Sequence, residues 1–124
     1  MNIAIFTDTY EPQINGVVSS SVTLKNSFEA LGYRVFIFAP SIKGFVDTDK
    51  DIFRFSSVPY PFLKEHRLVL PLSRQLKEFN KLNIDIIHLQ TPFSLGFLGL
   101  YLAKRYKIPV LHTYHTFFKA YLHY

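Results

Sequence analysis

Short apolar runs alternate along the chain with longer stretches in which apolar residues recur at helical spacing. Residues 2–7 form a short apolar strand that is followed by a polar loop. Residues 34–39 form an unbroken apolar run, which is typical of a strand buried in a parallel sheet. Between these strands, residues 17–31 are predicted to form a helix that stops before Gly32. Its apolar face consists of Val17, Leu24, Phe28 and Leu31, with Ser21 as a small member.

The rest of the chain continues this alternation and predicts the fold class. Residues 41–51 are polar and contain three aspartates, which predicts a surface loop. Further strands are predicted at residues 52–55, 84–89 and 110–113, and further helices at residues 71–82 and 93–106. Strands that alternate with helices predict an α/β fold, with a Rossmann-like parallel sheet and helices on both of its faces.

Composition narrows the class of protein. The 124 residues suffice for one domain, and a hydrophobic content of 48% excludes a disordered tail. The absence of cysteine excludes disulfides and thiol nucleophiles, and the residues after Met1 lack a signal-peptide pattern, so we expect a cytoplasmic protein. The formal net charge of +5 suits an anionic partner such as a nucleic acid, a nucleotide or a membrane surface, but a basic soluble protein carries it equally well.

The loop after the first strand is the first candidate site. It ends in Asn15-Gly16, directly before the predicted helix. The N–H groups and the dipole at a helix N-terminus attract phosphate, and a glycine lets the backbone approach a ligand without a Cβ in the way. We therefore predict that Asn15, Gly16 and Val17 bind substrate or donor. The alternative is an ordinary turn glycine.

Other polar residues follow predicted strands at the same edge of the sheet, where open α/β sheets bind ligands. Asp8 ends the first strand and is predicted either to accept a hydrogen bond from a substrate hydroxyl or to cap the loop, and we rank capping first. Gln90 and Thr91 follow the strand at residues 84–89 and are predicted as acceptor-side contacts. The alternative is that Gln90 and Thr91 only form the turn between a strand and the next helix.

Three segments of the chain resemble a known family. They read FTDTYEPQINGVVSS at residues 6–20, DIIHLQTPFSLG at residues 85–96 and IPVLHTYHTFFKAYLHY at residues 108–124. In this order they resemble the N-terminal half of the retaining glycosyltransferases of family 4, which have the GT-B fold. The resemblance is strongest to bacterial enzymes that transfer glucose from UDP-glucose to diacylglycerol or glucosyl-diacylglycerol.

The resemblance implies two domains that bind different substrates. Residues 1–124 correspond to part of the N-terminal, acceptor-side domain, and the C-terminal domain that binds the nucleotide sugar has no counterpart in them. We therefore expect little or no transfer by this chain alone. The implied partners are UDP-glucose or a related nucleotide sugar as a substrate and a lipid acceptor, with no cofactor and no metal ion.

The resemblance also implies a role for His115, which lies in the segment Thr113-Tyr114-His115-Thr116. The matching histidine of the family contacts the transferred sugar and helps to stabilise the transition state, so His115 is the predicted catalytic residue. The alternative is a histidine that is buried in the core. A metal site with His112 is disfavoured, because residues three apart on a strand point to opposite faces.

A stretch that mixes apolar and basic residues lies between the predicted strands at residues 52–55 and 84–89. Such a mixture suits an anionic lipid surface, and the resemblance places this region against the membrane that holds the acceptor. The residues predicted to contact the membrane are Tyr60, Phe62, Lys64 and Arg67. The alternative is a loop whose apolar residues pack on the core. If these residues contact the membrane, we expect a peripheral protein at the inner face of the cell membrane.

Several other functions remain open or are disfavoured. A family 4 transferase with a polysaccharide or small-sugar acceptor would share Gly16 and the His115 motif but would need no basic, apolar surface. A non-enzymatic basic module that binds lipid is a further alternative. No interleaved arginine–aromatic motif is present, so we expect no nucleic-acid partner. The glycine fingerprint of a nicotinamide-binding domain is absent after the first strand.

Overall fold

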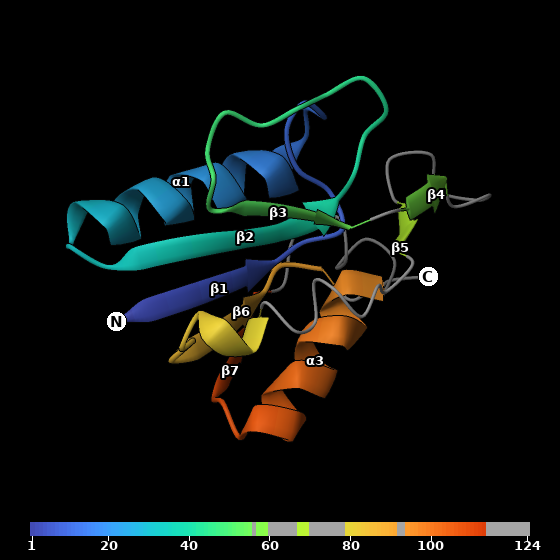
Figure 1. Ribbon diagram of the computed structural model, residues 1–124. Helices are drawn as coiled ribbons and strands as arrows, with labels where there is room; N and C mark the ends of the chain where they lie inside the picture. The colour runs from blue at the N-terminus through green and yellow to red at the C-terminus, as the bar shows by residue number, and fades with distance from the viewer. Residues whose placement is uncertain (56, 60–66, 70–78, 92–93, 114–124) are drawn as a thin grey trace, which may run out of the picture.

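Five parallel strands form the sheet at the centre of the molecule, in the order β3-β2-β1-β6-β7 (Figure 1). The computed structural model describes residues 1–55, 57–59, 67–69, 79–91 and 94–113. The strands of the sheet are β1 (Asn2–Phe6), β2 (Arg34–Pro40), β3 (Ile52–Phe55), β6 (Ile86–Leu89) and β7 (Val110–His112). The helices are α1 (Gly16–Ala30), which joins β1 to β2, and α3 (Ser94–Tyr106), which joins β6 to β7.

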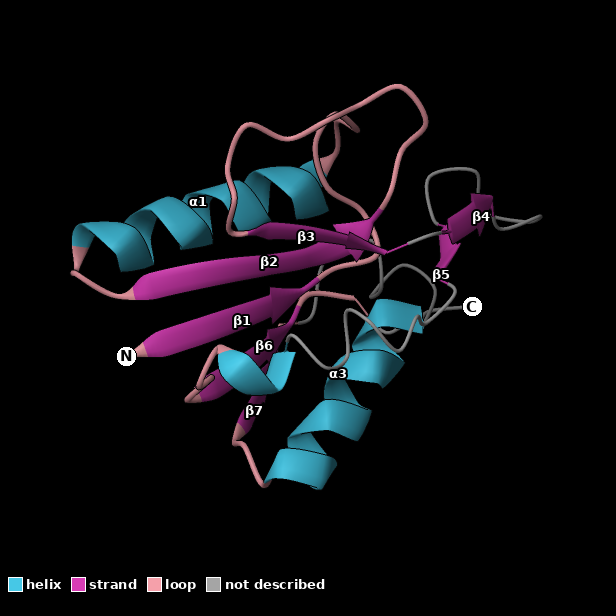
Figure 2. Ribbon diagram, viewed as in Figure 1, coloured by secondary structure: helices cyan, strands magenta, loops and turns pink. Residues whose placement is uncertain are grey.

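The two helices cover opposite faces of the sheet (Figure 2). On β1, Ile3 and Ile5 belong to the cluster that packs against α1, whereas Ala4 and Phe6 belong to the cluster that packs against α3. Successive side chains of a strand point to opposite faces, so an apolar run without interruption is what a strand covered on both sides requires. The predicted α/β fold, a Rossmann-like parallel sheet with helices on both faces, is confirmed.

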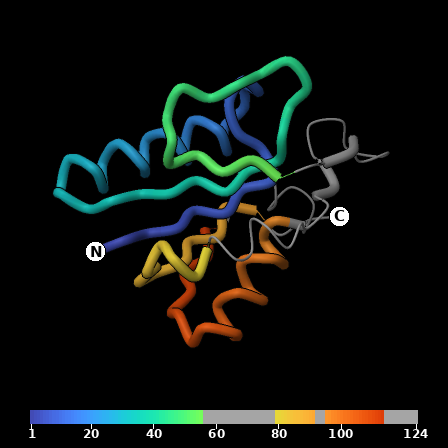
Figure 3. Tube along the Cα trace, viewed as in Figure 1, coloured from blue at the N-terminus to red at the C-terminus, as the bar shows by residue number. Residues whose placement is uncertain are grey.

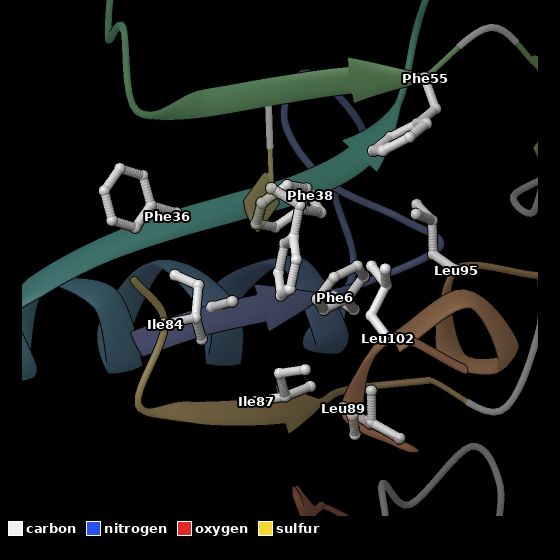
Figure 4. Packing of buried hydrophobic residues seen from close by; sticks show 12 residues of the cluster. Phe6, Phe36, Phe38, Phe55, Ile84, Ile87, Leu89, Leu95 and Leu102 are labelled. Carbon is white, nitrogen blue, oxygen red and sulfur yellow. The ribbon is translucent and has the colours of Figure 1, made fainter. Parts of the chain in front are cut away.

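Stacked phenylalanines fill the face that α3 covers (Figure 4). The rings of Phe6 and Phe38 lie 4.6 Å apart and are nearly parallel, and Phe38 stacks at 5.1 Å on Phe53. These rings come from β1, β2 and β3, three neighbouring strands. Aromatic pairs add attraction beyond the apolar area that they bury, so this stack ties the strands together through their side chains.

Most predicted elements are present, with shifted ends. Helix α1 ends at Ala30, and Leu31 is 68% exposed rather than part of the buried face, because the chain turns there into Gly32 with a φ of +89°. Strand β6 begins at Ile86, two residues later than predicted, where its pairing with β1 begins. The surface loop at residues 41–51 is confirmed. Of the helix predicted at residues 71–82, residues 79–81 are helical and residues 71–78 lie outside the described ranges.

A second, two-stranded sheet was not predicted. Strand β4 (Ser57–Pro59) pairs antiparallel with β5 (Arg67–Val69). The prolines in this part of the sequence obscure the strand pattern, because proline lacks a backbone donor and is found only at the edges of sheets. A two-stranded ribbon consists only of edges and therefore tolerates Pro59. In the described part of the chain, no helix is long and apolar enough to cross a bilayer.

Two glycines let α3 pack closely on the sheet. A Cβ at Gly99 would lie 2.5 Å from Cδ2 of Leu89 and 3.1 Å from Cγ of Phe6. A Cβ at Gly96 would lie 2.1 Å from the carbonyl oxygen of Thr91. A backbone carbonyl has less freedom to move than a side chain, so the N-terminus of α3 is held directly on the segment that follows β6.

Gly96→Ala is expected to destabilise the protein by about 1–3 kcal/mol, because the new methyl group overlaps the carbonyl of Thr91. The matched control is Gly16→Ala in the first turn of α1, where a Cβ would meet no atom within 4 Å, and this change is expected to be neutral or slightly stabilising. Urea unfolding of both variants measures the difference. Equal unfolding free energies would contradict the close approach of α3 to residue 91.

Candidate functional site

The centre of the sheet provides a place for a ligand between β1 and β6. The chain runs outward from β1 to β2 and β3 on one side, and from β6 to β7 on the other. The connection after β1 goes to α1 on one face, and the connection after β6 goes to α3 on the opposite face. Adjacent connections that diverge to opposite faces leave a crevice at the carboxyl ends of the strands, which is where open α/β sheets bind ligands.

Asp8 lies at this point and joins three elements. Its side chain is 0% exposed, and its carboxylate accepts hydrogen bonds from the hydroxyl of Thr91 and, at 2.8 Å, from the backbone N–H of Leu95. The backbone N–H of Asp8 donates to the Thr91 hydroxyl oxygen at 2.9 Å. Leu95 is in the first turn of α3, where a carboxylate also complements the helix dipole. The carboxylate therefore caps the start of α3, whereas the predicted cap of its own loop and a direct contact of Asp8 with substrate both stay predictions.

Asn15 caps α1 through its side chain. Its Oδ1 accepts the N–H of Val18 at 2.9 Å, and its Nδ2 donates to the Thr9 hydroxyl oxygen at 2.9 Å. The hydroxyl of Thr9 in turn donates to Oε1 of Gln13 at 2.9 Å. The loop is thereby fastened to the helix by its own side chains. In the first turn of α1, the N–H groups of Gly16 and Val17 have no carbonyl partner within the helix.

Gly16 is exposed, and the fold does not require a glycine there. No atom of the described residues lies within 4 Å of the position that a Cβ would take, and the φ of this residue is not in the left-handed region. Neither packing against the described residues nor backbone conformation therefore requires the glycine. Binding of a ligand at Gly16 stays a prediction.

Arg54 fastens the middle of the same loop and was not singled out by the sequence. Its guanidinium donates two 2.8 Å hydrogen bonds to the carboxylate of Asp47, and it also reaches the carbonyl oxygens of Glu11 at 2.5 Å and Pro40 at 3.0 Å. Its Cζ lies 5.6 Å from the ring centre of Tyr10 and 5.2 Å from that of Phe45. Figure 3 shows the two segments that it joins, the loop after β1 and the loop at residues 41–51.

Ion pairs also fix the loop at residues 41–51 to α1. The ammonium of Lys25 lies 2.6 Å from Glu29 and 3.1 Å from Asp49, at one wall of a pocket of about 430 Å³. Burial alone would lower the pKa of Lys25, but the hydrogen bonds to Glu29 and Asp49 outweigh it and the pKa is raised. The pKa of Asp49 lies below its ordinary value, because its carboxylate accepts the N–H of Asp51 and a hydrogen bond from Lys25.

Tyr10 adds no titrating group near neutral pH. It is 2% exposed, and burial together with the neighbouring charge of Glu11 raises the pKa of its phenol to about 12. A neutral phenol under the loop suits a structural role. We therefore assign the side chain to the support of the loop and not to acid–base chemistry.

The segments after β6 and β7 complete the described edge. Gln90 is almost fully buried, and its backbone N–H donates to the carbonyl oxygen of Phe6 at 2.9 Å. Nε2 of His88 lies 2.5 Å from the Thr113 hydroxyl oxygen, which links β6 to the residue that follows β7. As predicted, these segments lie beside the end of β1, but the side chain of Gln90 lies in the interior beneath the crevice.

Some predicted residues cannot be compared with the structure. His115 and Thr116 lie outside the described residues, as do Tyr60, Phe62 and Lys64. Arg67 is the first residue of β5. Within the described ranges, no group of three or more histidine, aspartate or glutamate side chains is arranged to hold a metal ion.

Asp8→Ala is expected to lower the unfolding free energy by about 2–4 kcal/mol, because it leaves two buried donors without an acceptor. Asp85→Ala is the matched control, since Asp85 also accepts a backbone N–H, that of Asn2 at 2.7 Å, but at an exposed position. Its cost is expected to stay below about 1 kcal/mol. Chemical denaturation compares the two. A stable Asp8→Ala protein would instead favour Asp8 as a substrate ligand.

The comparisons with known proteins agree with this architecture. The family model of Glycosyltransferase Family 4 matches residues 14–124. The chain is 45% identical over 133 residues to the alpha-monoglucosyldiacylglycerol synthase of Streptococcus pneumoniae, and 41% identical over 127 residues to that of Acholeplasma laidlawii. Both alignments cover the whole chain but only 29% and 32% of the relatives.

The name of a more distant relative states a donor. The GDP-mannose-dependent alpha-mannosyltransferase of Corynebacterium glutamicum is 28% identical over 121 residues, which cover 94% of the chain and 29% of the relative. The chain thus spans about a third of the length of the curated relatives that it matches. Because the family model covers all but the first strand and part of the following loop, the chain belongs to glycosyltransferase family 4.

Proposed function

We propose that the chain is the N-terminal, acceptor-side part of a retaining GT-B glycosyltransferase that transfers glucose from UDP-glucose to a membrane lipid such as diacylglycerol. The observation that supports this most is the identity of 45% and 41% to two alpha-monoglucosyldiacylglycerol synthases over the whole chain. The identity to the mannosyltransferase of C. glutamicum is 28%. A C-terminal domain that holds the nucleotide sugar would complete the enzyme.

The described residues would contribute one wall of the active site. The N–H groups of Gly16 and Val17, at the positive end of α1, would face the charge that develops as the phosphate departs. His115 would contact the transferred sugar and hold it in place. In transfer with retention, the new bond forms on the face that the phosphate leaves, and the departing phosphate takes the proton of the acceptor hydroxyl. Asp8 and Thr91 would act by holding the crevice in shape.

The hairpin of β4 and β5 would bring the enzyme to the inner face of the cell membrane. It lies beyond the carboxyl ends of β1, β2 and β3, on the side of the crevice (Figure 2). The residues between its strands carry the apolar and basic side chains named above. An anionic bilayer attracts such a segment by about 1 kcal/mol for each basic residue. The membrane would then present the acceptor close to the proposed site.

A family 4 transferase with another acceptor is the second candidate. The observation in its favour is that relatives named for GDP-mannose-dependent transfer, whose names do not contain diacylglycerol, also align over 94% of the chain. Such an enzyme needs no membrane-binding hairpin. Transfer to a polysaccharide or a small sugar, with none to lipid, would favour it.

Labelled UDP-glucose and vesicles that contain diacylglycerol test the transfer. The complete open reading frame that contains this chain is expected to form labelled glycolipid, and the 124-residue chain alone is expected to form little or none. His115→Ala is expected to lower the rate by about 100-fold or more. Gly16→Ala is expected to lower it by about tenfold with no loss of stability.

Three outcomes would contradict different parts of the proposal. A folded, complete protein that forms no lipid product would remove diacylglycerol or glucose from the assignment. Unchanged transfer by His115→Ala would remove the catalytic role of that residue, and unchanged transfer by Gly16→Ala would remove the role of the first turn of α1.

Binding to vesicles tests the membrane contact separately. The double change Lys64→Glu with Arg67→Glu is expected to weaken binding to vesicles rich in phosphatidylglycerol by about tenfold or more, and added salt is expected to weaken wild-type binding. Lys81→Glu with Lys104→Glu is the control, since both lysines are exposed and the change in net charge is the same. Equal loss in the two proteins would show that net charge acts and not the hairpin.

A further inference from the structure

A groove runs along the surface of α1 beside the candidate site. Its volume is about 560 Å³, within the range of about 300–1,000 Å³ that is usual for small-molecule sites. Residues of the loop after β1, residues of α1 and a phenylalanine of the loop at residues 41–51 line it. The described apolar residues that line it are Pro12, Ile14, Val18, Val22 and Phe45.

The groove leads away from the first turn of α1. Ser19 and Thr23 line it and follow Gly16 by three and seven residues, so all three lie on one face of the helix. Seven residues of helix span about 10 Å. A long ligand in the groove would therefore have one end at the proposed reaction centre and would extend along the helix.

The charge of the groove selects against anionic ligands. Among the described residues that line the groove, Glu11 alone has an ionisable side chain, a carboxylate. The two cations nearby, Lys25 and Arg54, are both paired with carboxylates. A phosphate group would be repelled by Glu11, whereas an uncharged apolar chain would meet no such penalty.

The groove is held open by the surrounding structure. The guanidinium of Arg54 lies 5.2 Å from the ring centre of Phe45 and is fixed by Asp47. Ile14, which lines the groove from the loop after β1, is 93% exposed, and Phe45 is 37% exposed. Apolar side chains that face water around a preformed groove gain free energy when an apolar ligand covers them.

We propose that this groove binds one acyl chain of an uncharged diacylglycerol acceptor and places the acceptor hydroxyl at the first turn of α1. The inference rests on the proposed function, because the relatives whose name contains diacylglycerol suggest the class of ligand. It adds the location of the acyl chain. Diacylglycerol has no charge, which agrees with a groove whose ionisable residue is a glutamate.

Photolabelling tests the location. The complete protein is irradiated on phosphatidylcholine vesicles that contain diacylglycerol with a diazirine in one acyl chain, and the labelled peptides are identified by mass spectrometry. Saturable labelling is expected within residues 11–23 or at Phe45, and unlabelled diacylglycerol is expected to compete with it. Ser19→Trp fills the groove from an exposed position and is expected to reduce this labelling at least fivefold. Ser27→Trp, at an exposed position outside the groove, is the control and is expected to leave labelling unchanged.

Kinetics provide a second readout that a change in folding would not imitate. Ser19→Trp and Phe45→Ser are expected to raise KM for diacylglycerol by about tenfold and to leave KM for UDP-glucose within about twofold. Val46→Ser is the control for the second change, because Val46 is a neighbouring exposed apolar residue that does not line the groove. Equal effects of Ser19→Trp and Ser27→Trp would overturn the proposal.

The outcomes separate this inference from the proposed function. Transfer to diacylglycerol with labelling confined to residues 57–74, or with no saturable labelling, would overturn the groove and leave the enzyme assignment standing. Saturable labelling in the groove without any transfer would support the groove and overturn the assignment as a diacylglycerol glucosyltransferase.

Discussion

The buried carboxylate of Asp8 is the interaction on which the rest of the site depends. A carboxylate without exposure to water is costly unless donors surround it, and here the donors come from two other elements, the Thr91 hydroxyl and the N–H of Leu95. The cost of burial is therefore offset only when β1, the end of β6 and the start of α3 are all in place. Gly96 allows that arrangement, because a side chain there would overlap the carbonyl of Thr91. One polar group thus fixes how the two connections diverge around the crevice.

Arg54 and Asn15 hold the rest of the loop that leads to α1. Asp8 holds the beginning of the loop, Arg54 holds the carbonyl of Glu11 in its middle, and Asn15 closes its end on the helix. A loop that is held at three points presents its backbone N–H groups in a fixed position. Such preorganisation is what makes fixed dipoles effective at a reaction centre, since they need no reorientation when charge develops. The exposed Gly16 then lies at the end of a rigid segment.

The sequence predicted the parts of this structure that depend on near neighbours. The apolar runs predicted the strands of the sheet, and the apolar helical face from Val17 predicted α1, which begins one residue earlier at Gly16. The hydrogen bonds of Asp8 join it to residues 83 and 87 positions later in the sequence, and a hydrogen bond of Arg54 joins it to a residue 43 positions earlier. No periodic pattern in the sequence encodes such pairings. The hairpin of β4 and β5 was missed because Pro59 carries the opposite local signal. For Gln90, the sequence correctly predicted the edge of the sheet but gave no information that the side chain would be buried.

The distribution of charge separates two tasks that a lipid transferase must perform. The chain has a formal net charge of +5, yet the ionisable residue of the groove is Glu11. Lys64, Arg67 and Arg74 instead gather in the sequence around the hairpin. An anionic membrane attracts the basic segment through long-range electrostatics, whereas an uncharged acceptor is selected through apolar contact and the exclusion of phosphate. If one surface performed both tasks, abundant anionic phospholipids would compete with the acceptor. With the cations on the hairpin and the anion at the groove, the proposed enzyme would bind an anionic surface and still accept a neutral lipid from it.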